Sequence, residues 1–390
     1  MFRSPLLIIA LIAVAGSGQS ASSQISAASQ SADRPSWHDR FQSPTLTPQT
    51  SGTTNRLQAI SPVSTEVVWA SGVGGTYVKT TNGGATWKVG VVRGAETLQF
   101  RDVQGVSESV AYLLSAGTGT DSRIYKTEDG GDSWTLQFQN QDPNAFYDCF
   151  AFWTPKRGIT TSDSVNGRFP VIRTLNGRTW EDIGDRLPTA LPGEASFAAS
   201  GTCVATQGSR RAWIGTGGSV MGRILATTDG GNKWAAYPTP IVQGTSTSGV
   251  ISVDFRDAKH GILGGGELLA PTAFADTVAR SRDGGKTWLL VSRTPFPGAI
   301  YGLSYVREIR RLDDSNDAEE KVAEADEDRD DASPTRSVVA TGPSGAAWSP
   351  DEGDTWFLLP GVANYWAVAF ASPDAGWLVG TGGRILKISF

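Results

Sequence analysis

Histidine and cysteine are scarce in this chain of 390 residues, which has two of each: His38, His260, Cys149 and Cys203. So few ligands cannot build a His-rich zinc site or a cysteine-ligated iron–sulfur cluster. A Ser-His-Asp triad would have to use one of the two histidines, and no G-x-S-x-G sequence supports one. We therefore expect both histidines in turns or at the surface, and we predict no metal site and no cofactor.

Long apolar runs are also missing, with one exception at the N-terminus. Residues 6–15 are ten apolar residues that follow Arg3 and precede small residues, a pattern typical of a cleaved secretory signal. Such a run is too short to span a bilayer. We predict a signal peptide and the start of a leader in residues 1–28, and a flexible leader in residues 29–36. We expect export to the periplasm or the extracellular space with no membrane span after cleavage, a retained N-terminal anchor being the alternative.

The net charge is small as well. The chain carries −5 overall, but residues 313–331 hold eleven carboxylates against Lys321 and Arg329, a local balance of −9 that leaves about +4 elsewhere. A charge this weak and scattered does not suggest nucleic-acid binding. The acidic run has almost no large apolar residues, so we predict a disordered insertion at residues 312–335. Recruitment of a basic partner by this run is the alternative.

The chain is rich in glycine and tryptophan, and one short motif recurs. Gly occurs 46 times and Trp 13 times, and 19% of the residues are charged, which favours a turn-rich all-β protein. The motif begins with Thr or Ser, has Asp or Asn two residues later, continues through Gly and ends in Trp. Repetition at such a spacing indicates a repeat architecture. The six copies, 46 to 68 residues apart, are TTNGGATW (80–87), TEDGGDSW (127–134), TLNGRTW (174–180), TTDGGNKW (227–234), SRDGGKTW (281–288) and SPDEGDTW (349–356).

Each copy, which we call a box, has turn residues in its middle and strand formers at its ends. Asp or Asn bonds its own backbone two residues on, Gly accepts a positive φ, and the closing Trp suits a half-buried pleated surface. A calcium loop is the alternative, but Ca²⁺ needs six to eight oxygen ligands and one carboxylate per copy falls short. We predict six hairpins in which the structural residues are Asn82, Trp87, Asp129, Trp134, Asn176, Trp180, Asp229, Trp234, Asp283, Trp288, Asp351 and Trp356.

Three more strand-like runs precede each box. Seven runs match the second of these strands: VVWAS, AYLLS, GITTS, AWIGT, GILGG, SVVAT and WLVGT. Seven units with six boxes leave the last unit one strand short, so we predict that residues 37–48 supply its fourth strand and close the ring, which removes an open sheet edge. The predicted fold is an all-β, seven-bladed β-propeller of four-stranded antiparallel blades over residues 37–390.

These residues resemble the Asp-box (BNR) repeat proteins, and within that group the bacterial relatives of the photosystem II stability/assembly factor. Besides the boxes, the resemblance rests on FYDCFAFWTPKRGITTSD (146–163), NGRFPVIRT (166–174) and LPGEASFAASGTC (191–203). It covers residues 37–390 and implies a seven-bladed propeller. Sialidases, sortilin-type receptors and xyloglucanases carry the same box, so the box alone does not assign a function.

The predicted topology indicates where a binding site would lie. If the boxes join third and fourth strands, they occupy one face, and the links between units lie on the opposite face around a funnel, where ligands usually bind. We expect a monomeric, non-enzymatic binding or assembly scaffold that recognises a protein or peptide there. Its mixed-charge, tyrosine-containing rim suits such a partner and is expected to contain Tyr147, Asp148, Arg168, Glu194, Arg223, Glu267, Tyr301 and Tyr365.

A glycoside hydrolase is the enzymatic alternative. Such enzymes need two carboxylates flanking the scissile bond, and no pair stands out from its spacing. A sialidase-like enzyme would carry an arginine cluster and a Phe-Arg-Ile-Pro type motif on its first blades, whereas this chain has GRFP (167–170) in its third unit. A xyloglucanase-like site needs two facing propellers, more than this length provides. We therefore predict no catalytic residues.

The two cysteines lie in the first strands of neighbouring units, and export would permit a disulfide between them. Aligning the units places Cys149 and Cys203 about three residues out of step, whereas a bond needs Cα atoms within about 7 Å. The alignment favours two free thiols, with a disulfide as the alternative.

Overall fold

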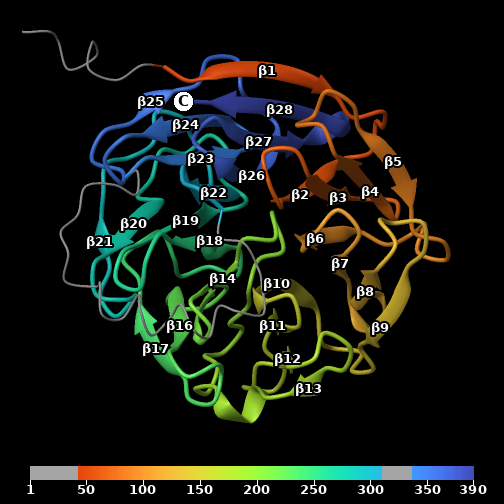
Figure 1. Ribbon diagram of the computed structural model, residues 1–390. Helices are drawn as coiled ribbons and strands as arrows, with labels where there is room; N and C mark the ends of the chain where they lie inside the picture. Colours follow the sequence, from red (N-terminus) through yellow and green to blue (C-terminus); the bar gives the residue numbers. More distant parts are fainter. Residues whose placement is uncertain (1–42, 310–335) are drawn as a thin grey trace, which may run out of the picture. The chain divides into compact units, whose positions relative to one another are not determined.

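The computed structural model describes residues 43–309 and 336–390, all within one compact unit that begins at Ser43. Its strands form seven four-stranded antiparallel sheets, the blades, arranged in a ring (Figure 1). The predicted seven-bladed propeller is confirmed. The predicted signal peptide and leader (1–36) and the acidic insertion (312–335) lie outside the described residues. No helix in the two described ranges has the length and apolar character needed to cross a membrane.

Within each blade the first strand is innermost and the fourth lies at the rim of the ring (Figure 1). Blade one consists of β2 (Leu57–Pro62), β3 (Val68–Gly72), β4 (Thr76–Thr80) and β5 (Lys88–Val91). Blade two consists of β6 (Phe100–Gly105), β7 (Ala111–Ser115), β8 (Arg123–Thr127) and β9 (Thr135–Gln139). Blade three consists of β10 (Tyr147–Thr154), β11 (Arg157–Ser162), β12 (Ile172–Thr174) and β13 (Glu181–Asp182). Blade four consists of β14 (Val204–Gln207), β15 (Arg211–Gly215), β16 (Arg223–Thr227) and β17 (Ala235–Pro238). Blade five consists of β18 (Ser248–Phe255), β19 (Gly261–Glu267), β20 (Val278–Ser281) and β21 (Leu289–Leu290). Blade six consists of β22 (Gly302–Tyr305), β23 (Val338–Gly342), β24 (Gly345–Ser349) and β25 (Phe357–Leu358). Blade seven consists of β26 (Tyr365–Ser372), β27 (Ala375–Gly380), β28 (Arg384–Ser389) and β1 (Thr45–Thr50). Short 3-10 turns are η2 (Gly119–Asp121), η3 (Gly184–Arg186) and η4 (Thr381–Gly383).

The second strands are buried on both of their faces. β7 and β27 are buried at every position, because each blade packs between two neighbours. They therefore have continuous apolar sequences instead of the alternation that marks a half-exposed strand. Trp69, Trp213 and Trp377 occupy these strands in blades one, four and seven and are at most 1% exposed. The core of the protein is thus a series of apolar layers between blades.

The ring closes through β1, which pairs antiparallel with β28 from Thr45↔Ser389 to Thr50↔Arg384. An N-terminal closing strand was predicted and is confirmed, but at residues 45–50 instead of residues 37–48. Thr45 pairs with Ser389, which is the last residue of β28. Residues before Thr45 therefore find no further residue of β28 to pair with. Residues 37–42 lie outside the described part of the chain.

Every box joins the third and fourth strands of its blade, as predicted, and its Asp or Asn accepts hydrogen bonds within the box. Asp283 Oδ1 accepts from the backbone N–H of Lys286 and Thr287 at 3.0 and 2.9 Å and from Ser281 Oγ at 2.9 Å, and its Oδ2 accepts from Thr287 Oγ1 at 2.6 Å. The Asp or Asn of the other five boxes accepts equivalent bonds. These side-chain oxygens hold the turn.

The boxes also connect neighbouring blades. In several blades a long side chain of the second or third strand donates to a backbone carbonyl in the box of the next blade. The bonds are Lys79 to Gly130 (2.9 Å), Arg173 to Gly230 (2.7 Å), Trp213 to Gly284 (2.8 Å), Arg280 to Asp351 (3.5 Å) and Lys387 to Gly83 (3.4 Å). The last bond joins blade seven to blade one, so this set of contacts runs across the ring closure.

Blade four departs from the repeat, because an irregular stretch precedes β14. We call residues 195–202 the crossing segment. Arg101 of blade two donates to Ala198 O at 3.3 Å, and Ser200 Oγ donates to Tyr301 O beside blade six at 2.5 Å. A stretch of blade four that bonds to blades two and six lies across the central channel.

Cys203 directly follows the crossing segment and forms a disulfide with Cys149 of β10, with 5.9 Å between the Cα atoms. The expectation of two free thiols was wrong, because the assumed offset does not exist. Cys149 pairs with Thr161, and Cys203 O accepts a hydrogen bond from Gly215 N. These partners are the fourth residues of the matching runs GITTS and AWIGT, so the two cysteines occupy the same register position in adjacent blades.

Candidate functional site

The first strands of the seven blades surround the central channel and run from one face of the ring to the other (Figure 1). We call the side that carries the boxes the box face. The opposite side, with the links between blades, is the funnel face, and the channel opening there is the funnel mouth. Each first strand begins at the funnel mouth, so its first residues decide the chemistry of this opening.

Five first strands carry a β-bulge at the same height, within their first few residues. The irregularities lie between positions 57 and 59, 100 and 102, 147 and 149, 250 and 252, and 365 and 367. A bulge leaves one residue unpaired and turns its side chain away from the regular alternation, and bulges are common beside binding sites. The residues they present are Gln58, Arg101, Asp148, Ile251 and Trp366.

An arginine and two aromatic rings meet where blades six, seven and one adjoin. The Arg56 guanidinium lies 4.5 Å from the centroid of the Trp366 ring. Trp366 makes an edge contact with Tyr301, with 5.0 Å between ring centroids. Arg56 Nε is buried and has no hydrogen-bond partner among the described residues. This corner of the mouth therefore combines stacking surface with an unused donor.

Arg101 adds a second positive charge near Arg56. Burial lowers the pKa of both guanidinium groups, and the charge of Arg56 lowers the pKa of Arg101 further. Arg101 donates to Gln99 Oε1 at 2.9 Å and to Ala198 O. Neither arginine is ion-paired with a carboxylate in the described part of the chain. Asp148 attracts Arg101 and raises its pKa, but no carboxylate among the described residues forms an ion pair with either guanidinium group. Two neighbouring, partly desolvated cations of this kind favour binding of an anionic group.

Two carboxyl groups adjoin each other on the wall that blade three contributes. Asp148 is 1% exposed, and its Oδ2 has no N–H donor among the described residues because its neighbour is the carboxyl of Asp163, directly after β11. Burial raises the pKa of both groups, that of Asp163 to about 6. Adjacent buried carboxylates do not readily ionise together, so the pair shares a proton.

The crossing segment forms the floor of the funnel mouth. Its residues Phe197 and Ala199 belong to an apolar cluster with Ile251 and Ala299, and Tyr301 packs against this cluster. The floor is therefore continuous with the aromatic corner formed by Trp366 and Tyr301.

Of the eight rim residues predicted from the sequence, Tyr301 lies at the mouth and Asp148 lies on its wall. Glu194 and Arg223 form a buried ion pair, with Arg223 Nε 2.8 Å from Glu194 Oε1, and the same carboxylate accepts from Thr216 Oγ1 at 2.6 Å. Both charges of this pair are therefore engaged inside the protein.

The other four predicted residues also have internal partners. Tyr147 and Tyr365 are 3% and 8% exposed and pack in the apolar layers between blades. Arg168 forms ion pairs of 2.6 and 2.5 Å with two aspartates of its own blade. Glu267 accepts hydrogen bonds of 2.5 Å from two threonine hydroxyls of the preceding link. The structure does not bring these four together, and a role for them in binding stays a prediction.

Arg56, Arg101 and Trp366 were missed from the sequence. The signal was a charged or large aromatic residue at the start of a first strand, where the strand is otherwise buried. To use this signal, one must know which residues of each first strand point into the channel. The bulges near the start of these strands shift that pattern by one residue. A strict alternation of inward and outward positions therefore misplaces these side chains.

A cavity of about 260 Å³ lies in the lower half of the channel, between the crossing segment and the box face, and the ends of all seven first strands line it. The two carboxylates that line this cavity, those of Asp102 and Asp254, already have hydrogen-bond partners within the protein. Asp102 accepts from the backbone N–H groups of Val103 and Phe150 at 2.7 and 2.8 Å, and burial raises its pKa well above the usual range. Asp254 accepts from Arg307 at 2.7 Å and from a backbone N–H of blade six. Both side chains hold neighbouring blades together.

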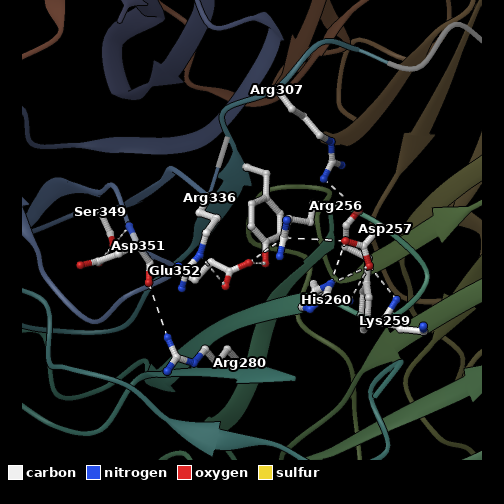
Figure 2. Close-up of polar contacts among 12 residues, drawn as sticks. Arg256, Asp257, Lys259, His260, Arg280, Arg307, Arg336, Ser349, Asp351 and Glu352 are labelled. Atoms are coloured by element: carbon white, nitrogen blue, oxygen red, sulfur yellow. Dashed lines mark hydrogen bonds and ion pairs between the residues drawn. The ribbon is translucent and has the colours of Figure 1, made fainter. Parts of the chain in front are cut away.

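A second polar cluster joins blades five and six on the box face (Figure 2). Glu352 stands in the sixth box where most boxes have glycine, with a φ of 59° and 2% exposure. Its carboxylate lies 2.7 Å from Arg256 and 3.4 Å from Arg336, and it accepts from the Tyr305 hydroxyl at 3.3 Å. The cluster compensates its own charges, which indicates a structural role.

His260 lies in the turn between β18 and β19, as expected from the sequence, and its Nδ1 is 2.8 Å from the Asp257 carboxylate (Figure 2). Residues 43–309 and 336–390 contain no group of three or more His, Cys, Asp or Glu side chains that could hold a metal ion.

The chain shares its fold with propellers of different functions. No protein-family model matches it, and no curated protein matches it. Among solved structures it is similar to YCF48 bound to D1 peptide, with a TM-score of 0.58 and 16% identity over 90% of this chain and 98% of that one. It is also similar to YCF48 from Cyanidioschyzon merolae, with a TM-score of 0.54 and 15% identity over 88% and 98% of the two chains.

A third similar structure is the GH74 xyloglucanase from Xanthomonas campestris, with a TM-score of 0.54 and 12% identity over 87% of this chain and 53% of that one. At identities this low the likeness shows a common propeller architecture. The choice between binding and hydrolysis depends on the site itself.

Proposed function

We propose that this protein is a non-enzymatic scaffold that binds a protein or peptide at the funnel mouth. An anionic group of the ligand contacts Arg56 and Arg101, and an apolar or aromatic side chain packs against Trp366 and Tyr301. The observation that carries this proposal is the pair of partly buried arginines that have no carboxylate partner among the described residues.

The energetics of the two arginines support a binding role. Burying a charge without an ion-pair partner lowers stability, so the hydrogen bonds of Arg101 to Gln99 and Ala198 O do not by themselves explain why two charges are placed here. A carboxylate that binds between them regains charge-assisted hydrogen bonds, which are about twice as strong as neutral ones. Arginine and tryptophan are also the residues in which binding energy concentrates at protein interfaces. The mouth thus has the composition of a recognition site.

The propeller neighbours are compatible with this proposal, since YCF48 was solved with a D1 peptide bound. Hydrolysis is the alternative that the GH74 neighbour keeps open. It needs two carboxyl groups free to reach one glycosidic bond. Four channel carboxyl groups in the described ranges bond instead to backbone N–H groups, to an arginine or to each other: Asp102, Asp148, Asp163 and Asp254. Their engagement favours binding over catalysis.

We further propose that the scaffold resembles the photosystem II assembly factor in type and acts after export. The resemblance of the boxes and of residues 146–163 supports the first part, and the apolar run at residues 6–15 supports the second.

Fluorescence anisotropy with synthetic peptides tests the proposed function. A set of labelled acidic peptides should bind, and basic peptides of the same length should not. Arg56→Gln combined with Arg101→Gln should weaken binding of the acidic set by roughly tenfold or more, because two charge-assisted contacts are lost. The exposed Arg93, in the link between blades one and two on the same face, is the matched control as Arg93→Gln.

Equal binding by the double variant and the control would disprove this placement of the site. Turnover on a glycan panel that is lost in Asp148→Asn or Asp163→Asn would replace the scaffold with the hydrolase.

A further inference from the structure

The crossing segment lies in the channel but is not a β-strand of a blade. Its sequence, ASFAASGT at residues 195–202, consists of small residues apart from Phe197. Such a stretch has little intrinsic preference for a strand. Its position must therefore come from tertiary contacts.

Both ends of the segment are fixed by strong links. The Glu194–Arg223 ion pair precedes it, with the Glu194 side chain fully buried. The Cys149–Cys203 disulfide follows it and ties it to blade three. Between these two links, the segment is held by individual hydrogen bonds.

The bonds in the middle of the segment reach three other blades. The Asp148–Asp163 pair accepts from two of its N–H groups, those of Ala198 and Ser196. Arg101 and Tyr301 add bonds from blades two and six. The segment thereby holds the Arg101 side chain and the backbone of Tyr301 in place at the proposed binding site.

Space lies on both sides of the segment. The funnel mouth is above it, and the cavity of about 260 Å³ is below it, with residues 200–202 among its lining. A displaced segment could therefore move without disturbing the packed layers between blades.

We propose that the Cys149–Cys203 disulfide is a redox lock on the crossing segment. With the bond formed, the segment divides the channel and supplies a rigid floor for the funnel site. With the bond reduced, the segment is released, the mouth and the lower cavity join, and Arg101 and Tyr301 lose their fixed positions. This proposal rests on the proposed function only for its effect on ligand binding.

The reductant is a dithiol. One of its thiolates attacks a sulfur of the bond and forms a mixed disulfide, and its second thiolate displaces the protein sulfur. Two electrons pass to the protein, which ends with two thiols, and the dithiol ends as a cyclic disulfide. Both cysteines are fully buried, so attack requires the segment to open first. The rate of reduction should therefore reach a plateau as the dithiol concentration rises.

Hydrogen–deuterium exchange of the full chain tests the lock without any ligand. Exchange in residues 195–202 is compared in oxidised protein, in protein reduced with dithiothreitol and in the double variant Cys149→Ala/Cys203→Ala. We expect roughly tenfold faster exchange in the last two, because local opening becomes easier. Exchange in the boxes should not change. Thr206→Ala is the matched control, since its hydroxyl bonds to Phe152 O between the same two blades at 2.9 Å, below the segment.

Unchanged exchange in residues 195–202 on reduction would overturn the proposal, and so would equal acceleration in all seven blades. If the double variant does not fold, reduced wild-type protein provides the same comparison. Ser200→Ala, which removes the bond to Tyr301 O, should also accelerate exchange in the segment while the disulfide is intact.

A second readout is the binding of the acidic peptides, which should weaken at least tenfold on reduction. If no peptide binds even the oxidised protein, the proposed function fails while the exchange result still decides the lock.

Discussion

The two ends of the channel are built differently. On the box face the same contacts recur from blade to blade, and charged groups such as Glu352 and Arg280 have partners within the fold. At the funnel mouth the repeat is interrupted by bulges and by the crossing segment. Arg56 and Arg101 remain without a carboxylate partner there in the described residues.

The difference separates stability from recognition. A feature repeated in most blades stabilises the ring at each step, as expected when each repeat contacts its neighbours. A feature that occurs once, and that leaves charges uncompensated, lowers stability and persists for another reason. Substitutions at the two ends should therefore have opposite signatures, with stability lost at the box face and binding lost at the funnel mouth.

The largest expected effect comes from the ring closure, which serves both ends. Deleting residues 1–50 removes β1 and leaves all six residues of β28 without their outer partner. We expect a large drop in the thermal midpoint or insoluble protein, because an open edge strand invites aggregation. Deleting residues 1–36 should leave the midpoint unchanged. Equal melting of the two truncated proteins in differential scanning calorimetry would contradict the closure by β1.

A single box should show the stability signature. Asp283→Ala leaves the N–H groups of Lys286 and Thr287 without their acceptor. We expect the free energy of unfolding to fall by about 1–3 kcal/mol, with peptide affinity unchanged. Urea titration and anisotropy measure the two quantities. A loss of affinity with no loss of stability would reverse the assignment of the faces.

The carboxyl pair at the mouth should make stability depend on pH. The pKa of Asp163 is raised from 3.8 to about 6 by burial, so the folded state binds more protons than the unfolded state over this range. Stability is then fully present below pH 4 and declines as the pH rises through 6. Asp163→Asn should flatten this decline. Urea unfolding of both proteins at pH 4.5 and pH 7 measures the change in the free energy of unfolding between the two pH values. An identical change in both proteins would show that the carboxyl pair does not cause the decline.

Removing an uncompensated charge should stabilise the fold slightly. Arg101→Gln relieves its repulsion with Arg56 and the desolvation of its guanidinium. We expect a small rise in the thermal midpoint together with weaker binding of acidic peptides. The exposed control Arg93→Gln should change neither quantity. A marked fall in the midpoint of Arg101→Gln would mean that this arginine is structural.

The smallest effect is expected from the acidic insertion. Replacing residues 313–331 with a short Gly-Ser linker should leave the thermal midpoint nearly unchanged, because each halving of a flexible loop alters its closure entropy by about 0.6 kcal/mol. A drop of many degrees would show that the insertion packs against the propeller. An intact fold that loses a basic partner would identify the run as a recruitment element.

The sequence predicted what repeats. The Gly-rich turns and buried second strands occur often enough to reveal their period, and the seven blades and their strand order followed from them. What occurs once was missed. The bulge that presents Arg101 depends on register, the crossing segment has no regular structure, and the disulfide required both cysteines to be placed in the same register.

The eight predicted rim residues also show that the repeat pattern does not reveal contacts that occur once. Glu194 and Arg223 were expected at loops of the funnel face, yet Arg223 begins β16 and the two charges neutralise each other inside the protein. Loop position alone does not reveal whether a charge is already paired. That information lies in tertiary contacts between segments about 30 residues apart, which the repeat pattern does not encode.

Hydrogen–deuterium exchange of the oxidised protein, with and without a saturating acidic peptide selected by anisotropy, tests the division between the two ends most directly. The account predicts protection at the start of β2, β6 and β26 and in residues 195–202, with no change in the six boxes. Protection of the boxes, with the funnel mouth unaffected, would contradict it.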